Sequence, residues 1–257
     1  MAQREQQVIG GSLESEVAAL QEALDRHRVE DAAKERQLDR YAAELRATSR
    51  RERHRARELD DSYMATVRAL SNAVEARDAY TAHHAERVAA FGVEIAAVSG
   101  LPLSSQPEIE FGFLLHDVGK VAVPDAILFK PGRLDATELE IMRRHPVIGE
   151  EIIAGIAFLG PATEVVRHHH ERWDGSGYPD GLAGEEIPLA ARVFALADAL
   201  DALTSDRPYR DAVTIAQARR ILHQSPGHFD PAVLDAFEQI SDARLEEIRR
   251  QSADEAI

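Results

Sequence analysis

The stretch QPEIEFGFLLHDVGK, residues 106–120, contains the helix signal on which the fold assignment depends. Residues 106–115 are mostly apolar toward their end and show no strand-like alternation, which favours a buried helix. Gly119 lies just beyond that end, where a glycine is a plausible cap residue because it tolerates a left-handed backbone. His116 and Asp117 therefore stand at the end of a predicted helix.

Helical signals continue on both sides of this stretch. Gly100 followed by Pro102 is a stop signal for a preceding helix, and Asp135-Ala-Thr-Glu138 has the spacing of a capping box that opens a following one. Alternating strand patterns with hairpin turns are nearly absent, so the sequence predicts an all-α fold. Helices are expected over residues 84–98, 106–115, 135–145, 147–156, 163–167, 189–203, 215–223 and 231–248.

The amino-terminal part of the chain is predicted to be one long exposed helix. Residues 12–62 contain no proline and are rich in Glu, Arg, Ala and Asp. Asp31 and Glu52 interrupt a heptad series of apolar residues. That series consists of Leu13, Val17, Leu20, Leu24, Leu38, Tyr41, Leu45 and Leu59. The pattern favours a short parallel coiled coil that dimerises the protein or carries a signal from a partner; the alternative is a solvated or partly frayed helix.

The character of the sequence changes near Tyr63, where a denser apolar stripe begins. Such a change from an exposed to a core-forming pattern is typical of a domain boundary. The sequence therefore predicts two parts: a helical coiled-coil region over residues 1–62, and a compact domain over residues 63–257.

The composition restricts the partners and the metal chemistry. The formal net charge of −15 opposes binding along a nucleic-acid polymer, although a small phosphorylated ligand needs only a local site. The chain has no cysteine, so a metal must use nitrogen and oxygen ligands. No run of roughly 18 apolar residues is present, so we expect no membrane association and a cytoplasmic location.

Histidines and aspartates with metal-ligand chemistry gather around the predicted helix ends. The His116-Asp117 pair alone means little, because such pairs usually lie at the surface or cap a helix. Asp198, however, lies in an apolar run, where an unpaired buried carboxylate would cost several kcal/mol, so it needs a partner. The other candidates are His84, His145, His169 and His170.

A series of short motifs between about residues 65 and 240 resembles the HD-GYP domain, a branch of the HD phosphohydrolase superfamily. The motifs are Glu75-Ala-Arg-Asp78 through Thr81, His84 and Glu86-Arg-Val88, His116-Asp-Val-Gly-Lys120, Ile127-Leu-Phe-Lys-Pro-Gly132, His145-Pro146 with Gly149, His169-His-Glu-Arg-Trp-Asp-Gly-Ser-Gly-Tyr-Pro179, Asp198 with Asp201-Ala-Leu-Thr204, Arg207-Pro-Tyr-Arg210 and Gly227-His-Phe-Asp-Pro231. They occur in the family's order and spacing. The resemblance implies an HD-domain helical bundle preceded by the long helix.

The resemblance also implies two divalent metal ions as cofactors. One would be bound by His84, His116, Asp117 and Asp198, and the other by His145, His169 and His170, with the Asp117 carboxylate bridging both. Imidazole and carboxylate ligands suit iron or manganese, which we expect, and also zinc, cobalt or nickel. Some family members bind a third metal through a glutamate four residues before the first histidine ligand. That position is Tyr80 here, so we expect two metals.

The implied activity is hydrolysis of cyclic di-GMP to linear pGpG, with further cleavage to GMP left open, which would lower the second-messenger level in bacterial signalling. Two metals sharing a water can supply a bridging hydroxide near neutral pH. Asp117 and Lys120 are the expected catalytic residues, with Lys120 neutralising charge on the phosphate. Arg207 and Arg210 are expected to contact the ligand, and Tyr178 to line the base pocket.

Two other functions remain open. The chain could bind a cyclic dinucleotide as a receptor with little or no turnover, although degenerate family members usually lose metal ligands and this chain has every one. It could instead hydrolyse a mixed cyclic GMP-AMP dinucleotide. The GYP segment is associated with partner recognition in the family, so a signalling-protein partner is expected there. Within it, Glu171 is expected either to orient a ligand histidine or to pair with Arg172 at the surface, and Asp201 to support a helix face.

Overall fold

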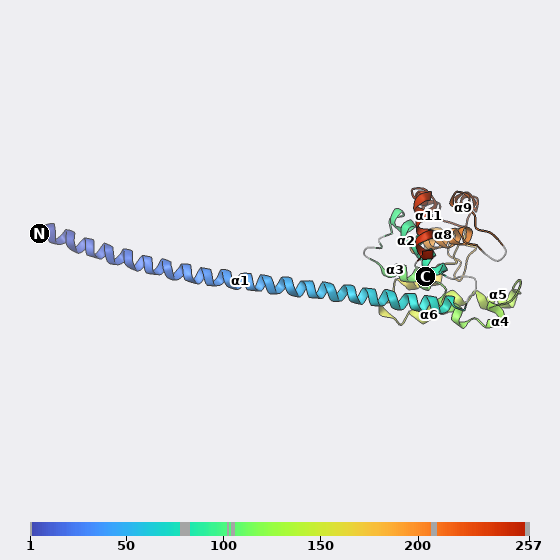
Figure 1. The fold of residues 1–257 in the computed structure, drawn as a ribbon, viewed down its shortest axis with the longest axis horizontal. Coiled ribbons are helices and arrows are strands. Elements are labelled where there is room, and N and C mark those ends of the chain that lie inside the picture. Colours follow the sequence, from blue (N-terminus) through green and yellow to red (C-terminus); the bar gives the residue numbers. More distant parts are fainter. Residues whose placement is uncertain (1, 78–82, 102, 104–105, 207–209, 255–257) are drawn as a thin grey trace. The chain divides into compact units, whose positions relative to one another are not determined.

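The computed structural model describes residues 2–77, 83–101, 103, 106–206 and 210–254, and over this part of the chain it is helical (Figure 1). The α-helices are α1 (Ala2–Glu75), α2 (His84–Val98), α3 (Glu108–Leu115), α4 (Asp125–Leu128), α5 (Ala136–Met142), α6 (His145–Ile153), α7 (Ala162–His168), α8 (Leu189–Thr204), α9 (Ile215–His223), α10 (Pro231–Phe237) and α11 (Asp242–Asp254). Short 3-10 helices are η1 (Val118–Ala122), η2 (Ala157–Leu159) and η3 (Gly184–Glu186). No strand is assigned within the described residues, so the predicted all-α class is confirmed.

The chain divides into two compact units, Met1–Ser62 and Tyr63–Ile257. The predicted long amino-terminal helix is confirmed, but α1 continues past residue 62 to Glu75. It continues because its last turns gain an apolar contact surface: Val67 is only 1% exposed, and the ring of Tyr63 stacks on another aromatic ring of the second unit. None of the helices in the described residues is long and apolar enough to cross a bilayer.

The core of the second unit is built on the packing of α2 against α8 and of α3 against α7. Four phenylalanines with no exposed surface fill it: Phe91, Phe113, Phe194 and Phe237. In α2 the buried positions recur every three or four residues, which is the helical period that turns one stripe toward a core. A Cβ at Gly92 would lie 2.6 Å from the Phe113 ring, so this glycine lets α2 and α3 approach closely.

Gly119 has a different role from the predicted one. It does not cap α3 with a left-handed backbone; it lies inside η1, and a Cβ there would meet the His145 carbonyl oxygen at 1.9 Å. The backbones of η1 and α6 touch at this point. Any larger residue would clash here, so the glycine allows the His116-Asp117 segment to pack against the start of α6, which carries His145.

The last predicted helix also differs from expectation. The helix predicted over residues 231–248 is two helices, α10 and α11, and the Arg219 guanidinium from α9 donates hydrogen bonds to the carbonyls of Phe237 and Ile240 at the break. These bonds satisfy carbonyls that a continuous helix would have bonded internally. The predicted capping box is confirmed: the Asp135 carboxylate accepts the Glu138 N–H at 2.9 Å, and the Glu138 carboxylate accepts the Asp135 N–H at 2.8 Å.

Candidate metal centre

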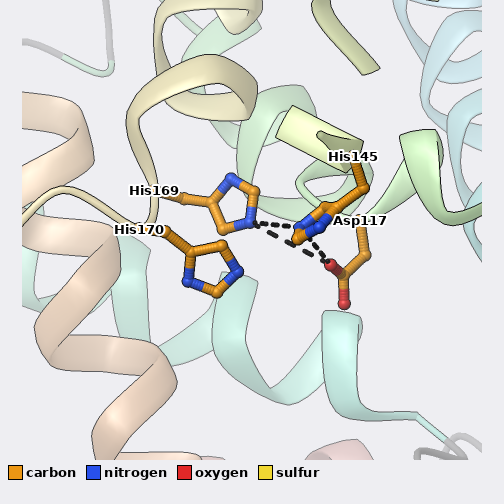
Figure 2. A group of neighbouring side chains, drawn as sticks. All are labelled: Asp117, His145, His169 and His170. Carbon is orange, nitrogen blue, oxygen red and sulfur yellow. Dashed lines mark hydrogen bonds and ion pairs between the residues drawn. The ribbon is translucent and has the colours of Figure 1, made fainter. Parts of the chain in front are cut away.

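The metal-ligand candidates converge from separate helices, and each lies at a helix end except Asp198, which lies within α8. His84 and His145 are the first residues of α2 and α6, and His116 follows α3. Figure 2 shows four of the side chains pointing toward one another: Asp117, His145, His169 and His170. One ligand atom of each of these four lies within 4.8 Å of the others.

Two histidines of this group present lone pairs to each other. His145 Nδ1 lies 2.7 Å from the Met142 carbonyl oxygen, and His169 Nδ1 lies 2.8 Å from that of Val166. Because a carbonyl can only accept, both Nδ1 atoms carry the proton, which leaves lone pairs on the Nε2 atoms. These Nε2 atoms are 3.2 Å apart. When both rings are neutral, neither can donate to the other, so a cation between them is the arrangement that the donor set fits.

His170 completes this group as a neutral ring. Burial, with the neighbouring His145, lowers the pKa of His170 to about 3. Burial likewise holds the pKa of His169 well below its ordinary value. Both imidazoles are therefore uncharged near neutral pH, which is the form that binds a metal ion.

A second group surrounds His84. Its Nδ1 lies 2.7 Å from Asp201 Oδ2, so Nδ1 carries a proton, and its Nε2 lies 3.4 Å from Asp198 Oδ1. His116 is oriented in the same way, since its Nδ1 donates to the Phe113 carbonyl at 2.9 Å. Burial lowers the pKa of His84, but the bond to Asp201 and the charge of Asp198 outweigh it and raise the pKa overall. The carboxylates thus favour positive charge at this point.

Asp117 connects the two groups. Its Oδ1 lies 3.2 Å from His145 Nε2 and 4.0 Å from His169 Nε2, whereas its Oδ2 lies 3.1 Å from His116 Nε2 and 2.7 Å from Lys120 Nζ. Burial raises the pKa of Asp117, but the charges of His116 and Lys120 outweigh burial and hold the pKa well below its ordinary value. The carboxylate is therefore ionised, with each oxygen facing a different set of histidines. This geometry suits a ligand shared between two ions.

Asp201 does more than support a helix face. It is 1% exposed; its Oδ2 accepts the His84 Nδ1–H, and its Oδ1 accepts the Arg87 Nε–H at 2.6 Å. A carboxylate behind a ligand histidine fixes the ring and its tautomer. The sequence carried a signal for this role, because Asp198 and Asp201 are three residues apart and so share one face of α8.

Replacing Asp201 by alanine is expected to weaken metal binding at His84 by about 10–100-fold, because the ring loses its orienting acceptor. Asp201→Asn keeps an acceptor for the ring and should lose less. Calorimetric titration of metal-free protein with Mn²⁺ measures both. The exposed Asp211→Ala serves as the control and should bind as wild type. Equal affinity of Asp201→Ala and wild type would contradict the assignment.

Both expectations for Glu171 are wrong. Glu171 is only 2% exposed, which excludes an ion pair with Arg172 at the surface. Its Oε1 accepts the N–H groups of Asp180 at 2.7 Å and Gly181 at 3.0 Å, and its Oε2 accepts that of Leu182 at 3.1 Å. Glu171 therefore holds the Gly-Tyr-Pro loop rather than a ligand ring. These partners are 9 to 11 residues away, which no local pattern reveals.

Of the remaining predicted site residues, Tyr178 lies beside the metal-ligand candidates, whereas Arg210 and Arg207 are not shown there. The Tyr178 ring stacks on that of His170, with centroids 4.7 Å apart, and burial raises the pKa of Tyr178 to about 12, so its phenol is neutral. Arg210 is exposed and donates to the Ala202 carbonyl, so its ligand contact stays a prediction. Arg207 lies outside the described residues, as does Tyr80, the position considered for a third metal.

Comparison with known proteins places this geometry in a family. The HD domain model matches residues 68–233. The cyclic di-GMP phosphodiesterase response regulator RpfG of Xanthomonas campestris pv. campestris is 42% identical over 194 residues, which are 74% of this chain and 51% of that protein. The 3'3'-cGAMP-specific phosphodiesterase 2 of Vibrio cholerae serotype O1 is 45% identical over 169 residues, 65% of this chain and 32% of that protein.

A solved structure gives the same assignment at the level of the fold. Bd1817, a HDG"Y"P protein from Bdellovibrio bacteriovorus, aligns with a TM-score of 0.50 at 20% identity, over 62% of this chain and 51% of that one. The chain spans 51% and 32% of the length of the two curated relatives named above. The resemblance to the HD-GYP branch is thus confirmed, and the chain belongs to the HD domain family.

Proposed function

We propose that this chain is a metal-dependent phosphodiesterase that hydrolyses cyclic di-GMP to linear pGpG, with GMP as a further product to be tested. The observation that carries the proposal is the Asp117 carboxylate, whose two oxygens face two separate sets of histidines. The names of the relatives support the substrate class, since they include phosphodiesterases of cyclic di-GMP and of 3'3'-cGAMP.

The donor set suits two divalent ions, iron or manganese in the first place and zinc, cobalt or nickel as alternatives. One would be held by His84, His116, Asp117 and Asp198, and the other by Asp117, His145, His169 and His170. When bound, two such ions supply a water activated near neutral pH and hold the oxygens of a phosphodiester. The chain itself keeps the imidazoles of His169 and His170 neutral and the shared carboxylate ionised.

The side chains around the centre can bind and orient the substrate. Lys120, whose Nζ lies 2.7 Å from Asp117 Oδ2, places a cation where negative charge on the phosphate would increase. Tyr178, whose ring stacks on that of His170, is positioned to line the pocket for a guanine base. We propose Arg207 and Arg210 as cations for the second phosphate or a guanine edge. A signalling partner at the Gly-Tyr-Pro loop also stays a prediction.

The proposal is tested by incubating protein, reconstituted anaerobically with Fe²⁺ or Mn²⁺, with cyclic di-GMP and with 3'3'-cGAMP in separate and mixed reactions. Chromatography should show pGpG from cyclic di-GMP as the faster reaction. Faster opening of 3'3'-cGAMP would assign the chain to the second substrate. Metal-loaded protein that binds cyclic di-GMP, measured by calorimetry, and yields no product would show a receptor instead.

We also propose that residues 1–62 form a parallel coiled coil with a second copy, separate from the HD-GYP domain over residues 63–257. Large apolar side chains are exposed along one seam of α1: Leu20, Leu38 and Leu45 are 66–71% exposed. Seven-residue spacing of such side chains is the pattern that a partner helix covers.

The double variant Leu20→Glu and Leu45→Glu is expected to weaken the dimer at least about 100-fold, because each buried leucine contributes roughly 1.5–3 kcal/mol. Sedimentation equilibrium measures the change. Val29→Glu is the matched control: Val29 is 68% exposed but lies five residues after Leu24, off the seam. Monomeric wild-type protein, or equal weakening by Val29→Glu, would contradict the proposed dimer.

A further inference from the structure

The first turn of α2 carries the ligand candidate His84 but lacks a cap of the usual kind. A helix start leaves its first N–H groups without internal acceptors, and an N-cap side chain normally accepts the N–H of the second or third residue. Here the N-cap residue is His83, which has φ 59° and ψ 18° and makes no side-chain cap hydrogen bond. The left-handed backbone at this non-glycine residue is itself unfavourable.

Glu75 supplies the missing acceptor from another helix. Its Oε1 accepts the N–H of Ala85, the second residue of α2, with 2.5 Å between nitrogen and oxygen. Ala85 is 3% exposed, so water has little access to replace this bond. A carboxylate at a helix N-terminus is also favoured by the helix dipole. The Glu75 side chain thus acts as the cap of α2, although Glu75 is the last residue of α1.

The position of Glu75 is fixed by neighbours on the same face of α1. Arg68, Ser71 and Glu75 follow the three- and four-residue steps of one helix face. Arg68 Nη1 lies 3.3 Å from Glu86 Oε1 on α2. The Ser71 hydroxyl donates to the Leu114 carbonyl at 2.8 Å on α3, and Leu114 lies two residues before His116. The end of α1 therefore bonds to α2 and α3, two of the three helices that deliver the ligand group of His84, His116 and Asp198.

A cavity places the Glu75 side chain beside that group. It is lined by Ser71, Val74, Glu75, His84, Ala85, Leu114, Leu115, His116, Asp117, Val118 and Lys120. Three residues of the lining are predicted ligands and a fourth is the predicted catalytic lysine. Glu75 thus belongs to the wall of the metal centre as well as to the cap of α2.

We propose that Glu75 is a positioning residue that holds His84 in place for metal binding by capping α2 from the end of α1. The proposal rests on the proposed metal centre. It assigns to the last turn of α1 a direct contact with the segment that carries a metal ligand. Loss of the carboxylate frees the Ala85 N–H and loosens the first turn of α2, so His84 becomes a weaker ligand, whereas the group of His145, His169 and His170 is unaffected.

The experiment compares Glu75→Ala and Glu75→Gln with wild-type protein. Glu110→Ala is the matched control, because it removes another half-buried carboxyl group, on α3, that is not part of the cavity lining. The first readout is hydrogen exchange at the Ala85 amide in metal-free protein. The second is titration with Mn²⁺, followed by electron paramagnetic resonance, which separates tighter and weaker ions. Circular dichroism and urea unfolding establish that each variant is folded.

In Glu75→Ala, exchange at Ala85 is expected to rise about tenfold, from the loss of one hydrogen bond. Affinity for one of the two Mn²⁺ ions should fall about 10–100-fold while the other stays unchanged. Glu75→Gln keeps an acceptor oxygen and should remain within about threefold of wild type on both readouts. Glu110→Ala should match wild type.

Unchanged exchange and unchanged Mn²⁺ affinity in folded Glu75→Ala would overturn the proposal. Equal weakening of both ions, or the same loss in Glu110→Ala, would also overturn it, since either result indicates a general effect on packing. The exchange and metal readouts need no substrate. A chain that hydrolyses no cyclic dinucleotide would therefore refute the proposed function and leave the test of Glu75 intact.

Discussion

Asp117→Ala is expected to lower kcat for cyclic di-GMP hydrolysis on the order of 10³-fold or more, the largest effect of any single substitution in the site. Asp117 is the one residue with oxygens directed at both histidine groups, among the residues that the structure describes. Its loss removes a ligand from both proposed ions at once. It also leaves Lys120 without the carboxylate 2.7 Å away that holds its ammonium group.

The variant Asp117→Asn tests whether the negative charge of Asp117, rather than its shape, is required. The amide keeps the shape of the side chain but cannot bridge two cations with two anionic oxygens, so it should be nearly as inactive as the alanine variant. Steady-state kinetics with chromatographic product analysis gives kcat, and metal analysis gives the ion content. Asp211→Ala should retain wild-type activity. Retention of more than about a tenth of kcat by Asp117→Asn would contradict the bridging role.

Removal of metal is expected to abolish hydrolysis and to lower the melting temperature. Without a cation, the lone pairs on His145 Nε2 and His169 Nε2 face each other at 3.2 Å inside the protein. An ion present at about 100 times its dissociation constant contributes about 2.7 kcal/mol to the free energy of unfolding. For a domain of this size that corresponds to roughly 5–10 °C in melting temperature.

The test is chelation, dialysis and return of Mn²⁺ or Fe²⁺, with activity and melting temperature followed throughout. The control is His145→Ala, which breaks the facing pair of lone pairs. Removing the metal should lower the melting temperature of this variant by less than it lowers that of wild type. Full activity, or an unchanged melting temperature, in protein shown by elemental analysis to be metal-free would contradict the account.

Local patterns predicted most of the helices and the capping box at Asp135, because each depends on residues within a few positions of one another. They failed where a distant group decides the outcome. The sequence pattern over residues 231–248 predicted one helix. In the structure the helix is broken, and Arg219 on α9 donates hydrogen bonds to the carbonyls at the break. Gly119 was predicted to cap a helix, but a glycine is required there because the backbone lies against the carbonyl of His145.

The candidate site divides in the same way. Motifs gave the ligand candidates, but the groups behind them depend on tertiary contacts. Glu171 accepts hydrogen bonds from a loop 9 to 11 residues later in the sequence, and Asp201 bonds to His84, 117 positions away. Glu75, the last residue of α1, caps the next helix, α2. Of these, Asp201 alone had a local signal, its three-residue spacing from Asp198.

The most direct test of the central claim is the position of the metals in crystals of Mn²⁺-loaded protein, located by anomalous scattering. The account predicts two peaks roughly 3.5–4 Å apart, with one Asp117 oxygen near each. The first peak should lie among His84, His116 and Asp198, and the second among His145, His169 and His170. A single peak, or two peaks that do not share Asp117, would contradict the proposed two-metal centre.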